Sequence, residues 1–155
     1  MKKNLKKIFS LVLVVIWMLL IYYFSDQPGS VSGTISNSII YDFFDYIFEL
    51  FKINKDNLEK FVLIIHEPIR EIMHLLEYLI LGILIINFLN LIEIKENIFI
   101  ISILICFIYS VTDEIHQLFI IGRTFQYFDI LMDNIGSIIG SYLYKKFILD
   151  KKIAH

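Results

Sequence analysis

Long apolar stretches alternate with short polar ones along the chain, and four of the apolar stretches are long enough to cross a membrane. They are residues 8–24, 72–92, 98–119 and 130–149. An α-helix rises about 1.5 Å per residue, so stretches of roughly 17 to 22 residues match a hydrocarbon core of about 30 Å. The pattern therefore predicts an all-α membrane protein with four transmembrane helices.

The first stretch, 8–24, follows the basic segment KKNLKK and so has the beginning of a secretory signal. Its apolar part is long for a signal, and no small-residue cleavage site follows it. We expect residues 8–24 to be a retained first span.

Lysines flank both ends of the chain. They are Lys2, Lys3, Lys6 and Lys7 before the first span, and Lys145, Lys146, Lys151 and Lys152 at the end of the last. Because lysine and arginine gather on the cytoplasmic side of membrane proteins, both termini are expected in the cytoplasm. The connections 25–71 and 120–128 then face outward, and the turn 93–97 faces inward.

The long connection between the first two spans contains helical patterns. Residues 35–51 place Ile35, Ile39, Ile40, Phe43, Phe44, Ile47, Phe48 and Phe51 on one helical side. This spacing predicts an external amphipathic helix, either flat at the outer membrane interface or packed as a lid on the spans. A second short helix is expected at 57–66, ended by Pro68 because proline cannot continue a helix interior.

The acidic residues and histidines of the last three predicted spans lie toward the outer ends of these spans, and Asp129 directly precedes the last one. They are His74, Glu77, Asp113, Glu114, His116, Asp129 and Asp133, with Arg123 in the adjoining turn. Such groups are costly in a bilayer unless they are paired or hydrated. We therefore expect them to converge on one polar site inside the bundle, and these seven acids and histidines are the catalytic candidates.

Helical spacing supports that convergence. His74 and Glu77 are three residues apart, as are Asp113 and His116, so each pair shares a helix face.

The last predicted span also carries a stripe of small and acidic residues at helical spacing. Asp129, Asp133, Gly136 and Gly140 fall on a single side of it. Small residues at this spacing allow close helix approach, which would press both aspartates toward the other polar groups.

Four chemistries fit these residue types. Imidazoles and carboxylates on facing helices build metal sites in helical bundles. The candidate ligands of one or two divalent ions are His74, Glu77, Asp113, His116, Asp129 and Asp133. Arg70 and Arg123 are the chain's two arginines, and they form a candidate anion clamp.

The remaining two chemistries are catalysis and packing. His74 or His116, oriented by a carboxylate, fits acid–base catalysis. The alternative is a packing network in which Arg123 pairs with Asp113 or Asp129.

The segment FSDQPG after the first span is expected to form a turn because Pro28 and Gly29 are turn residues. Ser25, Gln27 and Gln117 are the polar residues expected to join the arginines in binding a substrate.

Composition narrows the class of protein. The chain has 57% hydrophobic residues, a mean hydropathy of +0.71 and a net charge of −2, with no basic excess for a nucleic-acid partner. Its single cysteine, Cys106, allows no internal disulfide.

In sequence, the chain resembles the VanZ-like family of small bacterial membrane proteins. The motifs that carry the resemblance are FSDQPGSVS (24–32), R-x-x-x-H-x-x-E-Y (70–78), SVTDEIHQLF-x-x-G-R (110–123) and D-x-x-x-D-N-x-G-x-x-x-G (129–140). They occur in family order over nearly the whole chain, so residues 1–155 are expected to form a single domain.

The chain departs from the family pattern at several positions. Glu71 stands where a basic residue is common, and Ile121, Phe125 and Phe128 replace the usual proline, glycine and basic residue before the first aspartate. These departures leave Arg70 and Arg123 as the candidate anion-binding residues.

The resemblance implies a Gram-positive-type cell envelope and reduced susceptibility to teicoplanin-like lipoglycopeptide antibiotics. The implied partners are membrane lipids and a lipid-linked wall precursor or the lipoglycopeptide itself.

Three functions follow from the sequence. They are a non-catalytic binder at the outer leaflet, an enzyme acting on a lipid headgroup or lipid-linked phosphate, and a transporter of an anionic solute. The last has least support because the polar groups avoid the midplane and no inverted repeat is present.

Overall fold

The computed structural model describes residues 2–56, 58–94 and 96–149, and these residues form helices without any strand. The elements are α1 (Lys2–Ser25), α2 (Gly29–Leu50), α3 (Leu58–Leu91), α4 (Ile98–Gln117) and α5 (Tyr127–Tyr144), followed by one π-helical turn, η1 (Lys145–Leu149). Among the predicted positions, Lys151, Lys152 and the side chain of Ile35 lie outside the described residues.

Three helices of the described chain are long and apolar enough to cross a membrane by length and composition, namely α1, α3 and α4. These helices contain the predicted span 8–24, all but the last residue of 72–92, and most of 98–119. The helix α5 is not among the three. It carries Asp129 and Asp133, which are buried against the other helices rather than exposed on the bundle surface.

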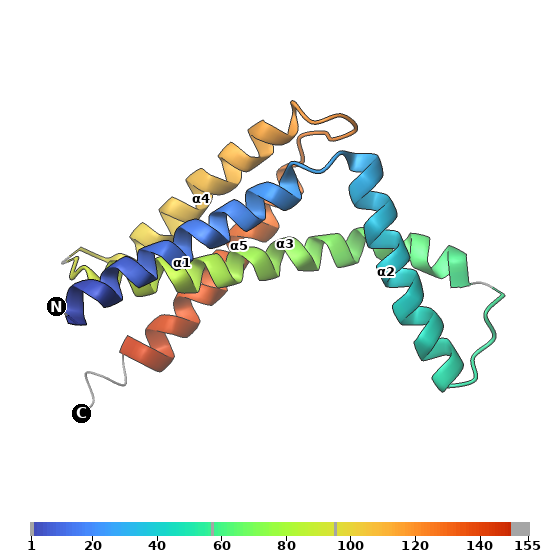
Figure 1. Cartoon of the computed structure of the whole chain (residues 1–155), viewed down its shortest axis with the longest axis horizontal. Helices are drawn as coiled ribbons and strands as arrows, with labels where there is room; N and C mark the ends of the chain where they lie inside the picture. The colour runs from blue at the N-terminus through green and yellow to red at the C-terminus, as the bar shows by residue number, and fades with distance from the viewer. Residues whose placement is uncertain (1, 57, 95, 150–155) are drawn as a thin grey trace.

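The chain alternates between two ends of the bundle. The N-terminus, the α3–α4 turn and the last turn of α5 lie at one end, and the α1–α2 and α4–α5 connections lie at the other (Figure 1). An ion pair between Lys3 and Glu93 joins α1 to the α3–α4 turn. The α3–α4 turn thus lies at the opposite end from the other two connections, and the side of the membrane that each end faces stays a prediction.

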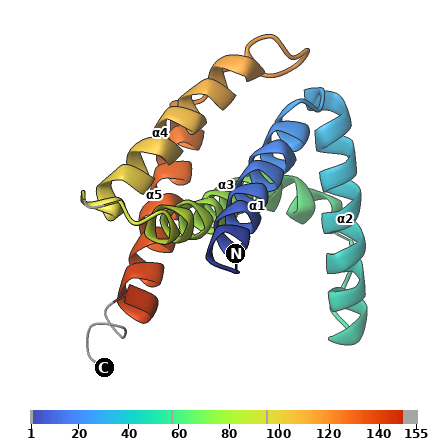
Figure 2. The same ribbon diagram turned by 60° about the vertical axis from the view of Figure 1, so that its left-hand side comes forward.

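The helix α3 is central, because it packs against each of the other four α-helices. In Figure 2 it lies between α1 on one side and α4 with α5 on the other. Its core includes Tyr78, Leu81 and Ile85, packed with Ile21 of α1 and Cys106 of α4.

Two side-chain hydrogen bonds also join α1 to its neighbours, one to α3 and one to α4. The indole of Trp17 donates to the carbonyl oxygen of Glu77 at 2.9 Å, and the Tyr109 hydroxyl donates to that of Met18 at 2.6 Å. Both bonds satisfy groups that would otherwise face an apolar interior.

The closest helix approach is between α3 and α5. A Cβ placed on Gly140 would lie 2.8 Å from the carbonyl carbon of Leu79, and one on Gly136 would lie 3.0 Å from that of Leu75. The small-residue stripe expected in the last span is therefore confirmed, and it brings the two helix backbones into direct contact.

The expected helix break at Pro68 is wrong, because α3 continues through this residue and the predicted helix 57–66 is its first part. Proline removes one backbone donor, but packing on both sides of it holds the helix together. Val62, Ile65 and Ile69 pack with α2, so separating the two halves would expose a buried apolar face.

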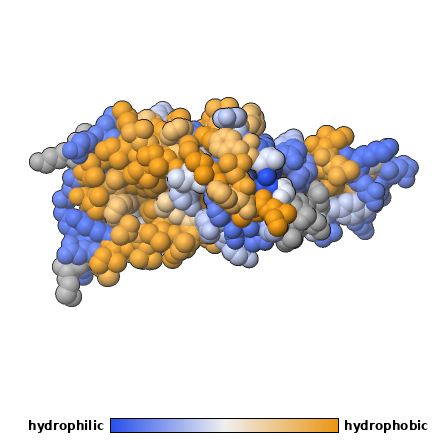
Figure 3. Space-filling model, turned by 90° about the horizontal axis from the view of Figure 1, so that it is seen from above, coloured by the Kyte–Doolittle hydropathy of each residue, from blue (hydrophilic) through white to orange (hydrophobic). Residues whose placement is uncertain are grey.

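The amphipathic helix α2 packs on the first part of α3, and the pair projects beyond the bundle (Figure 1). Ile40 is buried there and Phe44 is partly buried, whereas Ile39 and Phe43 remain exposed. One part of the apolar face of α2 therefore packs on the first part of α3, and the other part is exposed on the surface of the molecule. Figure 3 shows apolar residues covering much of one side of the molecule, with hydrophilic residues at the end that carries the N-terminus.

Candidate functional site

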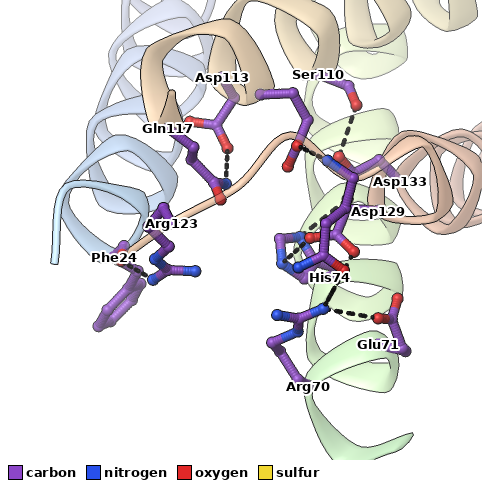
Figure 4. A network of polar contacts seen from close by, with 12 residues as sticks. Phe24, Arg70, Glu71, His74, Ser110, Asp113, Gln117, Arg123, Asp129 and Asp133 are labelled. Atoms are coloured by element: carbon purple, nitrogen blue, oxygen red, sulfur yellow. Dashed lines mark hydrogen bonds and ion pairs between the residues drawn. The ribbon is translucent and has the colours of Figure 1, made fainter. Parts of the chain in front are cut away.

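Charged residues from three helices meet at the end of the bundle that holds the α4–α5 connection (Figure 4). Figure 4 labels Arg70 and His74 of α3, Asp113 of α4, and Asp129 and Asp133 of α5. Glu114 of α4 joins them through its hydrogen bond with the backbone of Gln126, just before α5. The close contact of α3 with α5 positions the residues of these two helices directly against each other. Convergence of these residues agrees with the expectation from helical spacing.

His74 lies between two buried carboxylates. Its Nδ1 is 3.2 Å from Oδ1 of Asp133, and its Nε2 is 3.6 Å from Oδ2 of Asp129. The Ser110 hydroxyl donates to the other oxygen of Asp133 at 2.6 Å. The imidazole is therefore fixed in orientation, with an acidic partner on each ring nitrogen.

Arg70 uses one terminal nitrogen, Nη2, for all its polar contacts. This atom lies 2.7 Å from Oε1 of Gln126, 3.1 Å from Oε1 of Glu71, 3.2 Å from Oε2 of Glu67 and 3.4 Å from Oδ1 of Asp129. Within the described chain, its buried Nε has no hydrogen-bond partner. The Nη2 side of the guanidinium is thus occupied by hydrogen bonds and ion pairs, whereas its Nε–H remains a free donor within the described chain.

Two of these partners were not singled out from the sequence. Glu67 lies three residues before Arg70 on the same helix, a spacing that was available as a signal. Gln126 immediately precedes α5 in the connection, where nothing in the sequence indicated its contact with α3.

The α4 carboxylates hold the beginning of α5 and the end of α4. Oε2 of Glu114 accepts from the backbone N–H of Gln126 at 2.8 Å, while its buried Oε1 has no hydrogen-bond partner in the described residues. The Gln117 amide donates to Oδ2 of Asp113 at 3.4 Å. Glu114 therefore sets where α5 starts, next to Arg70 and Asp129.

His116 does not join the His74 centre. Its Nε2 lies 3.1 Å from Oδ1 of Asp26, and its ring packs on Tyr22 with centroids 4.6 Å apart. The pair Asp113 and His116 shares a helix, but the histidine turns toward α1. It links α4 to the end of α1 at the edge of the polar cluster.

Arg123 binds the end of α1 through backbone oxygens. Its Nε donates to Gln27 at 3.2 Å and one Nη to Phe24 at 3.5 Å. No ion pair of Arg123 occurs in the described residues, so the expected bridges to Asp113 or Asp129 are not formed; Asp129 pairs with Arg70 instead. In Figure 4 the guanidinium groups of Arg123 and Arg70 point toward one another.

Electrostatics agree with this placement. Burial lowers the pKa of the Arg123 guanidinium from its usual value, and the positive charge of Arg70 lowers it further. The two cations therefore repel each other across the site.

The remaining predicted residues lie at its margin. Ser25 is buried at the end of α1, and the Gln27 side chain turns back to the carbonyl oxygen of Tyr23 at 3.4 Å. Glu77 is half-buried, and its backbone oxygen accepts the hydrogen bond from the Trp17 indole. The FSDQPG turn is confirmed, because residues 26–28 connect α1 with α2.

The described residues contain no group of three or more His, Cys, Asp or Glu side chains placed to hold a metal ion. Both nitrogens of His74 already face carboxylates, and His116 is directed elsewhere. The arrangement fits an ion-pair network with open donors on two arginines.

Comparison with protein families gives one match. A family model described as VanZ/LLP1 matches residues 9–149, which include the helices α2 to α5 and most of α1. No curated protein and no solved structure matches the chain.

Proposed function

Since the chain belongs to the VanZ/LLP1 family, we propose that it acts at the outer face of the bacterial cytoplasmic membrane and reduces susceptibility to teicoplanin-type lipoglycopeptide antibiotics. It does so by binding or altering an envelope lipid or a lipid-linked wall component. Its partners are membrane lipids and such a precursor or the lipoglycopeptide, with no nucleic acid.

The proposal includes a topology of four spans with both termini in the cytoplasm. Lysines at the N-terminus and at Lys145 and Lys146 favour that side for both ends. The helix α5 is the fourth span because its aspartates face the bundle interior, where lipid does not reach them. The polar cluster then lies at the depth of the outer headgroups.

The observation that carries the function is the convergence of Arg70, His74 and Arg123 with buried carboxylates at this end of the bundle. Burying charge in a membrane protein is costly, so a packing role alone is better served by apolar residues. Arg70 and Arg123 keep N–H groups that can donate hydrogen bonds to the oxygen atoms of a headgroup.

Deletion and complementation in the source bacterium test the proposal. A strain lacking the chain should become more susceptible to teicoplanin, and the unaltered chain should restore the original susceptibility. Arg70→Gln should fail to restore it, because the headgroup contact is lost. Lys60→Gln, a charge change on an exposed residue away from the cluster, should restore it fully. Unchanged susceptibility after deletion would exclude the function.

A second candidate is an enzyme acting on a lipid headgroup or lipid-linked phosphate. It is favoured by the contact of His74 with Asp133, because an imidazole oriented by a carboxylate is suited to proton transfer. The purified protein should then release phosphate from a lipid-linked pyrophosphate, and a folded Asp133→Asn variant should not. Absence of turnover by the unaltered protein would eliminate this candidate.

A further inference from the structure

Arg123 is a half-buried cation whose contacts in the described chain are backbone carbonyls rather than carboxylates. The carbonyls of Phe24 and Gln27 lie at the end of α1, where a helix carries a partial negative charge. This partial charge orients the guanidinium, and the carboxylates of Asp113, Glu114 and Asp129 attract it without forming an ion pair with it in the described residues. One terminal nitrogen of Arg123 and the remaining donors of the other stay open.

Arg70 brings a second guanidinium to the same space. The two groups point toward one another in Figure 4, and the carboxylates around Arg70 contact its Nη2. Its buried Nε has no hydrogen-bond partner among the described residues. Two facing guanidiniums are stabilised by an anion between them, and phosphate oxygens match their forked donors.

The connection that carries Arg123 is strongly apolar and exposed. Phe119, Ile121 and Tyr127 have 80%, 86% and 82% of their surface exposed, although they flank the charged cluster. They continue the exposed apolar surface of α4 and α5, represented by Ile115 and Leu131. Exposed aromatic and aliphatic residues at the end of a membrane span are typical of a segment that enters the lipid interface.

We propose that Arg123, together with Arg70, binds the phosphate group of an outer-leaflet glycerophospholipid, while Phe119, Ile121 and Tyr127 contact the upper part of its acyl chains. This inference rests on the outward orientation in the proposed function and specifies the ligand class of the same site. A phosphodiester suits the site because its single negative charge meets the open donors while the carboxylates remain paired with Arg70 and His74.

Lipid binding to the purified full-length protein tests the inference. Delipidated protein in mild detergent is titrated with phosphatidylglycerol, with diacylglycerol and with inorganic phosphate, and binding is followed by native mass spectrometry. Phosphatidylglycerol should bind most tightly, because it alone supplies both the phosphate and the acyl chains. Tighter binding of inorganic phosphate, or equal binding of diacylglycerol, would overturn the inference.

Variants locate the site. Arg123→Gln should weaken phosphatidylglycerol binding by roughly tenfold or more, as expected for loss of a charged hydrogen bond, and Arg123→Lys should weaken it less. Lys60→Gln is the matched control and should bind as the unaltered protein does.

Folding is controlled by circular dichroism, and exposed positions provide a second route if Arg123→Gln does not fold. Phe119→Ser and Ile121→Ser alter side chains that pack little with the protein, so they should fold and bind phosphatidylglycerol more weakly. Unchanged binding by these variants would contradict the inference.

The outcome is separable from that of the antibiotic test. Loss of lipid binding in Arg123→Gln with unchanged teicoplanin susceptibility would support the lipid site and show that resistance does not depend on it.

Discussion

His74 shows how single residues hold the polar cluster together. Its ring lies between Asp133 and Asp129, and Ser110 binds the far oxygen of Asp133. Both aspartates are almost completely buried, so the ring nitrogens of His74 supply polar contacts to carboxylates that have little access to solvent. The same contacts restrict its freedom to act as a base.

At this scale we predict that His74→Ala strongly destabilises the protein. Loss of the imidazole leaves the buried Asp133 with the Ser110 hydroxyl but no basic partner, and breaking a buried pair in this way typically costs about 3–5 kcal/mol in the free energy of unfolding. Thermal unfolding in detergent measures the change. Met73→Ala, at an exposed neighbouring position, is the control and should have a much smaller effect.

A second substitution identifies the cause. Adding Asp133→Asn to His74→Ala should recover part of the stability, since it removes one of the unpaired charges. If the double variant is less stable than His74→Ala by the full cost of Asp133→Asn measured alone, charge compensation is not the reason for the loss.

At the scale of elements, the contact between α3 and α5 positions the cluster. Gly136 and Gly140 let α5 lie directly on the backbone of α3 at Leu75 and Leu79, one turn or less from His74 and Tyr78. Serine hydroxyls continue the seam toward α4, where Ser102 and Ser141 lie 2.9 Å apart. Small residues thus set the distance at which Asp133 reaches His74.

We predict that Gly140→Ala destabilises the bundle and separates α3 from α5. The added methyl group would meet backbone atoms of Leu79, which cannot rotate away, so a cost of about 1–3 kcal/mol or more is expected. Thermal unfolding in detergent is again the measurement. Ile139→Ala on the exposed side of α5 tests for a general effect of alanine in this helix. Equal unfolding temperatures for the two variants would contradict close packing as the cause.

At the scale of the whole molecule, the described chain has a polar cluster at one end and the N-terminal lysines at the other (Figure 1). The side on which each connection lies therefore decides what the cluster can bind. The α2–α3 connection and the α4–α5 connection should face the outside, and the α3–α4 turn should face the cytoplasm.

Cysteine labelling tests this orientation. Cys106 is buried, and a Cys106→Ser background removes its reaction altogether. In intact cells, Asn54→Cys and Thr124→Cys should react with a membrane-impermeant maleimide, and Glu96→Cys should react only after permeabilisation. The reverse pattern would place the cluster on the cytoplasmic side and exclude the proposed function.

Sequence patterns alone determined the helical class, the approximate extents of α1, α2 and α4, and the stripe by which α5 meets α3. These features depend on periodicity and composition, which are local properties of the chain. They also indicated that His74, Asp129 and Asp133 would meet, because each lies on a polar face near the same end of its helix.

Tertiary structure decided which partners each polar residue takes. Arg70, rather than Arg123, binds Asp129, and His116 turns to Asp26, because helix rotation and the course of the α4–α5 connection select among faces that the sequence leaves equivalent. Pro68 lies within α3 for a related reason: packing on α2 compensates for one missing hydrogen bond. Such outcomes depend on contacts between distant segments, which local patterns do not contain.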